Sequence, residues 1–189
     1  RLSSSAAECP DSLSSLELAP PPCRSFPATD LIATANALLD PRGQTAIWLG
    51  VTGFEDLISS LWKNLWPDLR RTFSFRLSFS PKDIVDDPRP TIVCSPEQLQ
   101  PRWINQNLID QNPALPMSES ARILCGHVDV NPVLSIANSL EIKLDSLKTF
   151  IRLERLNSLI SGNENFDSLL NALRLIDGLS KEPKIGKKL

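Results

Sequence analysis

The sequence lacks the signals by which most membrane, metal-binding and nucleotide-binding proteins are recognised. No apolar run approaches the roughly 20 residues that a bilayer-spanning helix needs, and the start of the chain lacks the apolar core of a signal peptide. It contains no C-x-x-C pair, no GxxxxGK[ST] loop and no GxGxxG loop. We therefore expect no membrane partner, no bound metal and no cofactor.

An excess of one charge is also missing. Lys and Arg number 20 against 22 Asp and Glu, which gives a formal net charge of −2. Such a balance provides no long-range field that would steer nucleic acid, although it permits a local basic patch. The chain begins without methionine, and we expect it to be part of a larger protein.

Cysteine is scarce and irregularly spaced, which fits free thiols in a reducing compartment. The four cysteines are Cys9, Cys23, Cys94 and Cys125. This pattern predicts a cytoplasmic protein.

The composition is that of a globular protein, with 41% hydrophobic and 22% charged residues. Serine and proline dominate residues 1–28, and such a composition is typical of a linker. Residues 29–130 carry the patterns of an α/β domain. Residues 131–189 are predicted to be a helical segment that ends in a basic tail.

Three short apolar stretches predict strands in the α/β domain. Residues 46–51 form a buried run, residues 72–79 alternate apolar and polar side chains, and residues 91–94 are β-branched and apolar. An amphipathic helix beginning at Phe54 separates the first two, so they form a βαβ unit with parallel strands. The fold class is therefore α/β (or α+β), with a small, partly parallel sheet.

The remaining patterns are less uniform. Residues 104–120 read as a long polar loop, residues 122–130 as a further strand, and residues 138–145 fit either a strand or a helix. Two helices, over 146–161 and 165–179, predict a C-terminal helical hairpin, with Gly162 as a left-handed C-cap.

Only one local cluster suggests catalysis. Cys125, His127 and Asp129 occupy alternate positions, and on a strand their side chains would share one face. A cysteine nucleophile needs a base, and the base needs an orienting group. Catalytic cysteine and histidine usually come from separate segments, so we prefer a structural strand with a surface histidine. A hydrolase-like enzyme completed by absent residues remains an alternative.

Three tryptophans are candidates for protein contacts. Tryptophan is enriched at interfaces because it is apolar and also donates a hydrogen bond. The candidates are Trp62, Trp66 and Trp103. Core packing is the competing interpretation, and the sequence does not separate the two.

A basic helix face is a candidate for nucleic-acid contacts. Lys148, Arg152 and Arg155 lie at positions i, i+4 and i+7 of the predicted helix over 146–161. In a chain of this net charge an ordinary solvated face is the simpler interpretation. A nucleic-acid-binding accessory subunit is the second alternative.

A family resemblance rests on the region from residue 31 to residue 103. The segments that carry it are Trp66-Pro67-Asp68-Leu69-Arg70-Arg71, Phe73-Ser74-Phe75-Arg76-Leu77, Ser80-Pro81 and Arg102-Trp103. This pattern resembles the middle region of bacterial GTPase-associated proteins found in anti-phage gene neighbourhoods. It covers less than half of the chain, and Trp66 stands where leucine is usual. The family supplies no catalytic residues for this region.

The resemblance implies a scaffold or adaptor that couples a nucleotide-dependent switch to an effector. Together with the lack of catalytic motifs, it predicts a non-catalytic interaction module of a larger bacterial assembly, such as one of anti-phage defence. The expected partners are other proteins, such as a GTPase or an effector from the same operon.

Overall fold

The computed structural model describes residues 27–85, 88–110, 116–162 and 165–179. Nearly all of the predicted linker and the whole basic tail lie outside these residues. The helices are α1 (Ala28–Leu38), α2 (Phe54–Asn64), α3 (Pro67–Thr72), α4 (Glu119–Leu124), α5 (Asn131–Ser139), α6 (Leu147–Ser161) and α7 (Phe166–Leu179). The strands are β1 (Ala46–Leu49), β2 (Phe75–Leu77), β3 (Ile92–Ser95) and β4 (Asn107–Leu108), and two 3₁₀ helices are η1 (Pro81–Ile84) and η2 (Glu97–Trp103).

The strands form one parallel sheet in the order β2-β3-β1-β4. This confirms the predicted fold class, and the two strands joined by α2 do run parallel. They are not neighbours, however, because β3 lies between β1 and β2. The second predicted strand is also shorter than expected, since Thr72 ends α3 and only Phe75–Leu77 pair with β3.

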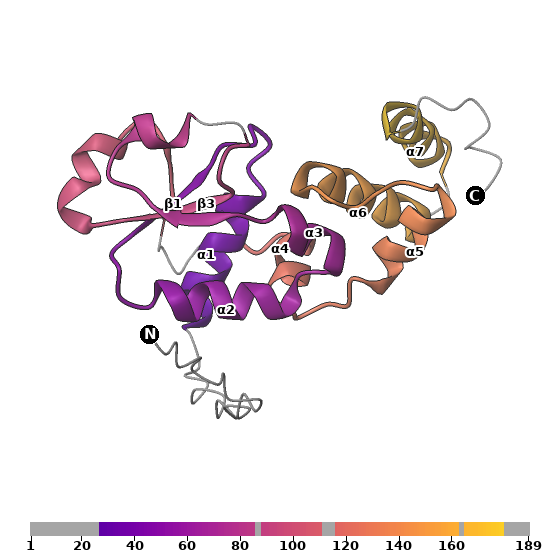
Figure 1. Cartoon of the computed structure of the whole chain (residues 1–189). Helices are drawn as coiled ribbons and strands as arrows, with labels where there is room; N and C mark the ends of the chain where they lie inside the picture. The colour runs from indigo at the N-terminus through magenta and orange to yellow at the C-terminus, as the bar shows by residue number, and fades with distance from the viewer. Residues whose placement is uncertain (1–26, 86–87, 111–115, 163–164, 180–189) are drawn as a thin grey trace, which may run out of the picture.

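Helices cover one face of the sheet, and the 3₁₀ segments cover the other (Figure 1). Trp48 and Cys94 are paired positions of β1 and β3, so their side chains share the face beneath α1 and α2. Ile47 and Val93 point to the opposite face, where they pack with Trp103 of η2.

The larger core continues from the sheet into the C-terminal helices. The rings of Trp66 and Phe150 lie 4.8 Å apart, and the Trp66 indole donates a hydrogen bond to the carbonyl of Leu144. One cluster of buried apolar side chains therefore spans both sides of residue 130. The division into two segments at that residue stays a prediction.

The C-terminal helices α6 and α7 form the hairpin that the sequence predicted (Figure 1). One detail differs: Gly162 has φ −85° and is not a left-handed C-cap. Residues 138–145, which fitted either a strand or a helix, are mostly neither, because α5 ends at Ser139 and a turn with the buried Leu140 follows.

Two further predictions are wrong. Residues 122–130 form no strand, because α4 and a turn occupy them. Residues 104–120 include β4, which pairs with β1, and the start of α4, so only part of this stretch is loop. Among the described residues, no helix is both long and apolar enough to cross a bilayer.

Candidate functional site

The carboxyl edge of the sheet is where open α/β proteins usually bind ligands. Here Gly50 follows β1 with φ +94°, and its N–H donates to the Ser95 carbonyl over 2.8 Å. A Cβ atom on Gly50 would lie 3.0 Å from Glu97 Oε1, so the Glu97 side chain closes over this turn. Glu55 and Asp56 in the first turn of α2 add negative charge. This edge is therefore unsuited to binding a phosphate.

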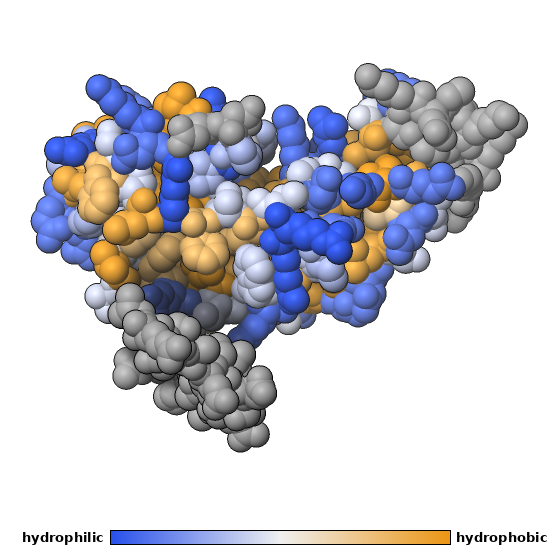
Figure 2. All heavy atoms as spheres, viewed as in Figure 1, coloured by the Kyte–Doolittle hydropathy of each residue, from blue (hydrophilic) through white to orange (hydrophobic). Residues whose placement is uncertain are grey.

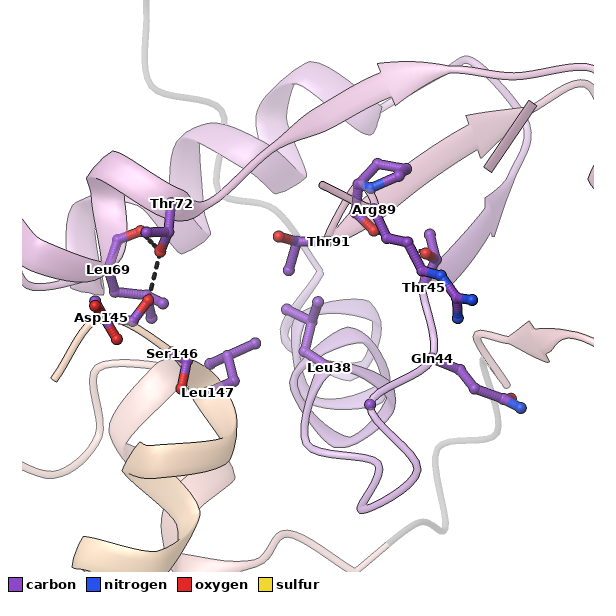
Figure 3. Close-up of a pocket in the computed structure, with 12 residues that line it drawn as sticks. Leu38, Gln44, Thr45, Leu69, Thr72, Arg89, Thr91, Asp145, Ser146 and Leu147 are labelled. Atoms are coloured by element: carbon purple, nitrogen blue, oxygen red, sulfur yellow. Dashed lines mark hydrogen bonds between the residues drawn. The ribbon is translucent and has the colours of Figure 1, made fainter. Parts of the chain in front are cut away.

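A pocket of about 230 Å³ lies at the opposite edge of the sheet, facing the start of α6 (Figure 3). Three hydroxyl groups of its lining bond within the fold itself, whereas the buried Oε1 of Gln44 has no hydrogen-bond partner among the described residues. Thr45 Oγ1 donates to the Pro90 carbonyl over 2.8 Å, Thr72 Oγ1 donates to the carbonyls of Leu69 and Asp145, and Ser146 Oγ caps α6. Because these three hydroxyls already have partners in the backbone, none of them is paired with a general base.

The Cys125–His127 segment is the end of a helix, which corrects the predicted strand. Gly126 has φ +75°, its N–H donates to the carbonyl of Ile123, and the N–H of His127 donates to the carbonyl of Arg122. These two bonds form a Schellman motif that terminates α4. Alternate residues here therefore do not share a face.

The chemistry of this segment also differs from that of a catalytic site. Cys125 is a core residue, and burial raises the pKa of its thiol to about 11, which disfavours the thiolate. His127 is exposed and lines a surface pocket. The Asp129 carboxylate accepts hydrogen bonds from the backbone and side chain of Asn131, which lower its pKa. The geometry therefore gives the hydrolase alternative no support.

Within the described part of the chain, no three His, Cys, Asp or Glu side chains gather closely enough to hold a metal ion. Cys94 and Cys125 are both buried free thiols.

The tryptophan candidates separate into core and surface positions. Trp66 and Trp103 are buried, and the Trp103 indole donates to Ser95 Oγ over 2.9 Å. Trp62 is partly exposed and meets Phe73 edge to face, with ring centroids 6.2 Å apart. Of the three, only Trp62 presents surface to a partner in this structure.

The basic candidates Lys148, Arg152 and Arg155 are all exposed on α6. Arg152 Nη1 lies 3.5 Å from the carbonyl of Gly178 on α7, and Arg155 shares a shallow pocket with Arg174 of α7. Glu154 of the same helix is buried. Nucleic-acid binding by this face stays a prediction.

The most exposed apolar feature of the sheet is a row of side chains on and beside β2, which we call the edge row: Phe75, Leu77 and Phe79. These side chains are 49%, 51% and 50% exposed, whereas Phe73 is buried. The Phe75 ring packs edge to face on Phe54 of α2, with centroids 6.5 Å apart. On the face shown in Figure 2, apolar side chains gather beside α2, where β2 runs in Figure 1. The alternation in the sequence identified these residues but not their exposure, which depends on the strand order.

The backbone beneath the edge row is also available. In the described residues β2 pairs only with β3. Ser74 O and Ser78 N bond to β3, so the N–H and C=O groups of Phe75 and Leu77 point away from the sheet. The backbone of Phe79 differs, because both of its polar groups are already bonded. Its N–H donates to Asp83 Oδ2 over 3.0 Å, and its carbonyl accepts from Arg102 over 3.2 Å.

Comparison with known proteins gives no relative from which a function could be carried over. No protein-family model, no curated protein and no solved structure matches this chain. The function must therefore be argued from the residues themselves.

Proposed function

We propose that this chain is a non-catalytic interaction module that binds an extended segment of a partner protein along β2. The observation that carries the proposal is the edge row, in which half-exposed aromatic and aliphatic side chains stand beside outward-pointing backbone groups. A strand edge of this kind is a template for another strand, and natural proteins usually protect it with lysine, proline or a covering loop. Strand β2 contains neither lysine nor proline, and within the described residues its outer side is unpaired, so it offers a binding surface for an added strand.

The geometry matches what strand addition requires. Backbone hydrogen bonds to Phe75 and Leu77 would provide affinity, and alternate side chains of the added segment would pack on the edge row and Phe54. The turn after β2 is fixed by Asp83, which accepts hydrogen bonds from Ser78, Phe79 and Ser80. A prearranged edge lowers the entropy that a partner must lose on binding.

The resemblance to bacterial GTPase-associated proteins suggests the kind of partner. A GTPase or an effector from the same operon would supply the added segment, and this chain would serve as the adaptor in a defence assembly. The buried free thiols Cys94 and Cys125 suit a reducing compartment, which supports a cytoplasmic location.

Site-specific photo-crosslinking in the source cell tests the proposal. A photoreactive phenylalanine analogue replaces Phe79 in one variant and exposed Ser135 of α5 in the control. We expect a discrete crosslinked protein from position 79 and none from position 135. The same product from both positions would contradict a specific edge contact.

A pair of charge variants separates lost binding from lost folding. Leu77→Lys/Phe79→Lys places lysines on the edge, and Ile104→Lys changes an apolar residue elsewhere that is even more exposed. We expect the first variant to lose the crosslinked partner and the second to retain it, at unchanged thermal stability of both. Retention of the partner by the edge variant would reject the proposal.

A further inference from the structure

Helix α7 carries a second apolar surface, far from the edge row. Phe166, Leu169, Leu170 and Leu173 lie at positions i, i+3, i+4 and i+7, which places them on one stripe of the helix. Their exposed fractions are 77%, 61%, 36% and 50%. We call these four residues the α7 stripe. Its size and continuity mark it as an interface, because single exposed apolar residues are common but contiguous stripes are not.

The hairpin does not use this stripe. The side of α7 that packs on α6 consists of Ala172 and Ile176, which are buried, with Leu175 and Leu179 partly buried beside them. Two different sides of α7 are therefore apolar, and α6 covers only one of them.

The charges beside the stripe indicate what covers it. Asp167 and Arg174 are two helical turns apart and lie on the same flank of the stripe. In an antiparallel helix pair, residues on the same flank of the two helices face each other. A second α7 running in the opposite direction would therefore set Asp167 of each helix against Arg174 of the other.

Arg174, the basic residue of these pairs, forms no ion pair within the described residues, although Asp177 lies one helical turn further along α7. Arg174 and Arg155 line one pocket of about 170 Å³ together with Asn171 and Leu175. Within the described residues, neither arginine nor Asp167 takes part in an ion pair. Two neighbouring guanidinium groups repel each other, and a carboxylate brought by a second chain would reduce this repulsion.

We propose that this protein forms a homodimer through an antiparallel pair of α7 helices, with the α7 stripe at the centre and two Asp167–Arg174 pairs across it. The arrangement has twofold symmetry, which is the commonest symmetry of protein oligomers. It goes beyond the proposed function, because the edge row lies on another part of the molecule. A stable interface buries roughly 800 Å² on each partner. Such an interface also takes about 20–30 residues a side, and the stripe supplies four, so we expect a weak dimer that depends on concentration.

Charge-exchange variants measured by sedimentation equilibrium test this arrangement. Asp167→Arg and Arg174→Asp each place like charges opposite each other in the homodimer, and we expect each to raise the dimer dissociation constant about tenfold. An equimolar mixture of the two single variants restores two attractive pairs, so a heterodimer forms. The double variant Asp167→Arg/Arg174→Asp restores the homodimer in the same way.

Two further variants complete the test. Leu169→Ser/Leu173→Ser removes apolar surface without touching the buried side of α7, and we expect the dimer to be lost while the melting temperature is kept. Lys148→Asp makes the same charge change as Arg174→Asp on the exposed face of α6 and should leave the dimer intact. A wild-type monomer at every concentration, or single charge variants that do not complement each other, overturns the proposal. Neither result bears on partner binding at the edge row.

Discussion

Ser120 Oγ donates a hydrogen bond to Glu154 Oε2 over 2.9 Å and thereby joins α4 to α6. Both residues are buried, and the second carboxylate oxygen accepts from Ser158 Oγ over 2.8 Å. A buried acid that loses its hydrogen-bond donor keeps the cost of desolvation. The pair is therefore a structural link between the α/β part of the chain and the C-terminal helices.

The contribution of the Ser120–Glu154 hydrogen bond to stability can be measured by replacing Ser120 with alanine. We expect Ser120→Ala to lower the free energy of unfolding by about 1–3 kcal/mol, because it leaves a buried carboxylate oxygen without its donor. Ser158→Ala removes a donor from an exposed residue of α6, where water can replace it, and should cost less than about 1 kcal/mol. Urea unfolding of both variants measures the difference, and equal losses would contradict this account.

Gly126 is predicted to resist substitution for two separable reasons. Its φ of +75° is unfavourable for any other residue, and a Cβ atom would lie 2.7 Å from Asn64 Oδ1. Asn64 Nδ2 in turn donates to the Leu124 carbonyl over 3.1 Å. We expect Gly126→Ala to cost about 2–3 kcal/mol, of which roughly 1 kcal/mol is the backbone strain.

Gly43→Ala is the matched control for this prediction. Gly43 has a similar φ of +62°, but no atom lies within 4 Å of the position its Cβ would take. It should therefore show only the backbone cost of roughly 1 kcal/mol. If both alanine variants lose the same free energy of unfolding in denaturant titrations, the clash with Asn64 does not contribute to the cost of Gly126→Ala.

The segment around Gly126 shows why residue alternation alone misled the sequence interpretation. Cys125, His127 and Asp129 alternate in type as strand residues do, but a left-handed glycine ends a helix there. The sequence held a usable signal, because Ser118 is the N-cap of α4 and Gly126 lies just beyond its last turn. A helix of two turns gives too short a pattern for its period to outweigh the alternation.

The sequence predicted the positions of several strands and helices better than it predicted which of their side chains are buried. Strands β1 and β3 and helix α2 follow from short-range patterns, and the sequence identified all three. The exposure of Phe75 and Leu77 depends on β2 lying at an edge, and the sequence does not state the strand order. The burial of Trp66 was equally unpredictable, because it depends on a contact with Phe150 of α6, which is distant in the sequence.

The Cys125 thiol should be nearly inert in the folded protein. Burial raises its pKa to about 11, so at pH 8 very little thiolate is present, and the core blocks access to reagents. We expect alkylation of Cys125 by iodoacetamide to be at least about a hundredfold slower in the native protein than in urea, as followed by peptide mass spectrometry. Because the folded pKa is raised, this group favours the folded state below the thiol's usual pKa of 9.0, and that contribution is lost as the pH rises toward 11. Rapid native labelling would revive the catalytic interpretation.

The turn that ends the edge row should loosen in acid. Hydrogen bonds from the backbone of Phe79, from Ser78 and from the backbone of Ser80 lower the pKa of Asp83 below its usual 3.8. A lowered pKa means that the stabilisation is present above pH 3.8 and is lost as the pH falls through the lower folded value. We expect the hydrogen-exchange protection of the Phe79 and Ser80 amides, measured by NMR, to fall in that range.

Asp83→Asn separates this local effect from the titration of other carboxyl groups. The amide oxygen of asparagine can still accept hydrogen bonds, but it carries no charge and does not titrate. In this variant the Phe79 and Ser80 amides should show weaker protection at neutral pH and no additional loss in acid. If the variant and the wild type lose protection in parallel as the pH falls, Asp83 is not the group that holds the turn. A loosened turn would also disturb Phe79 directly, so binding at the edge row should weaken over the same pH range in the wild type alone.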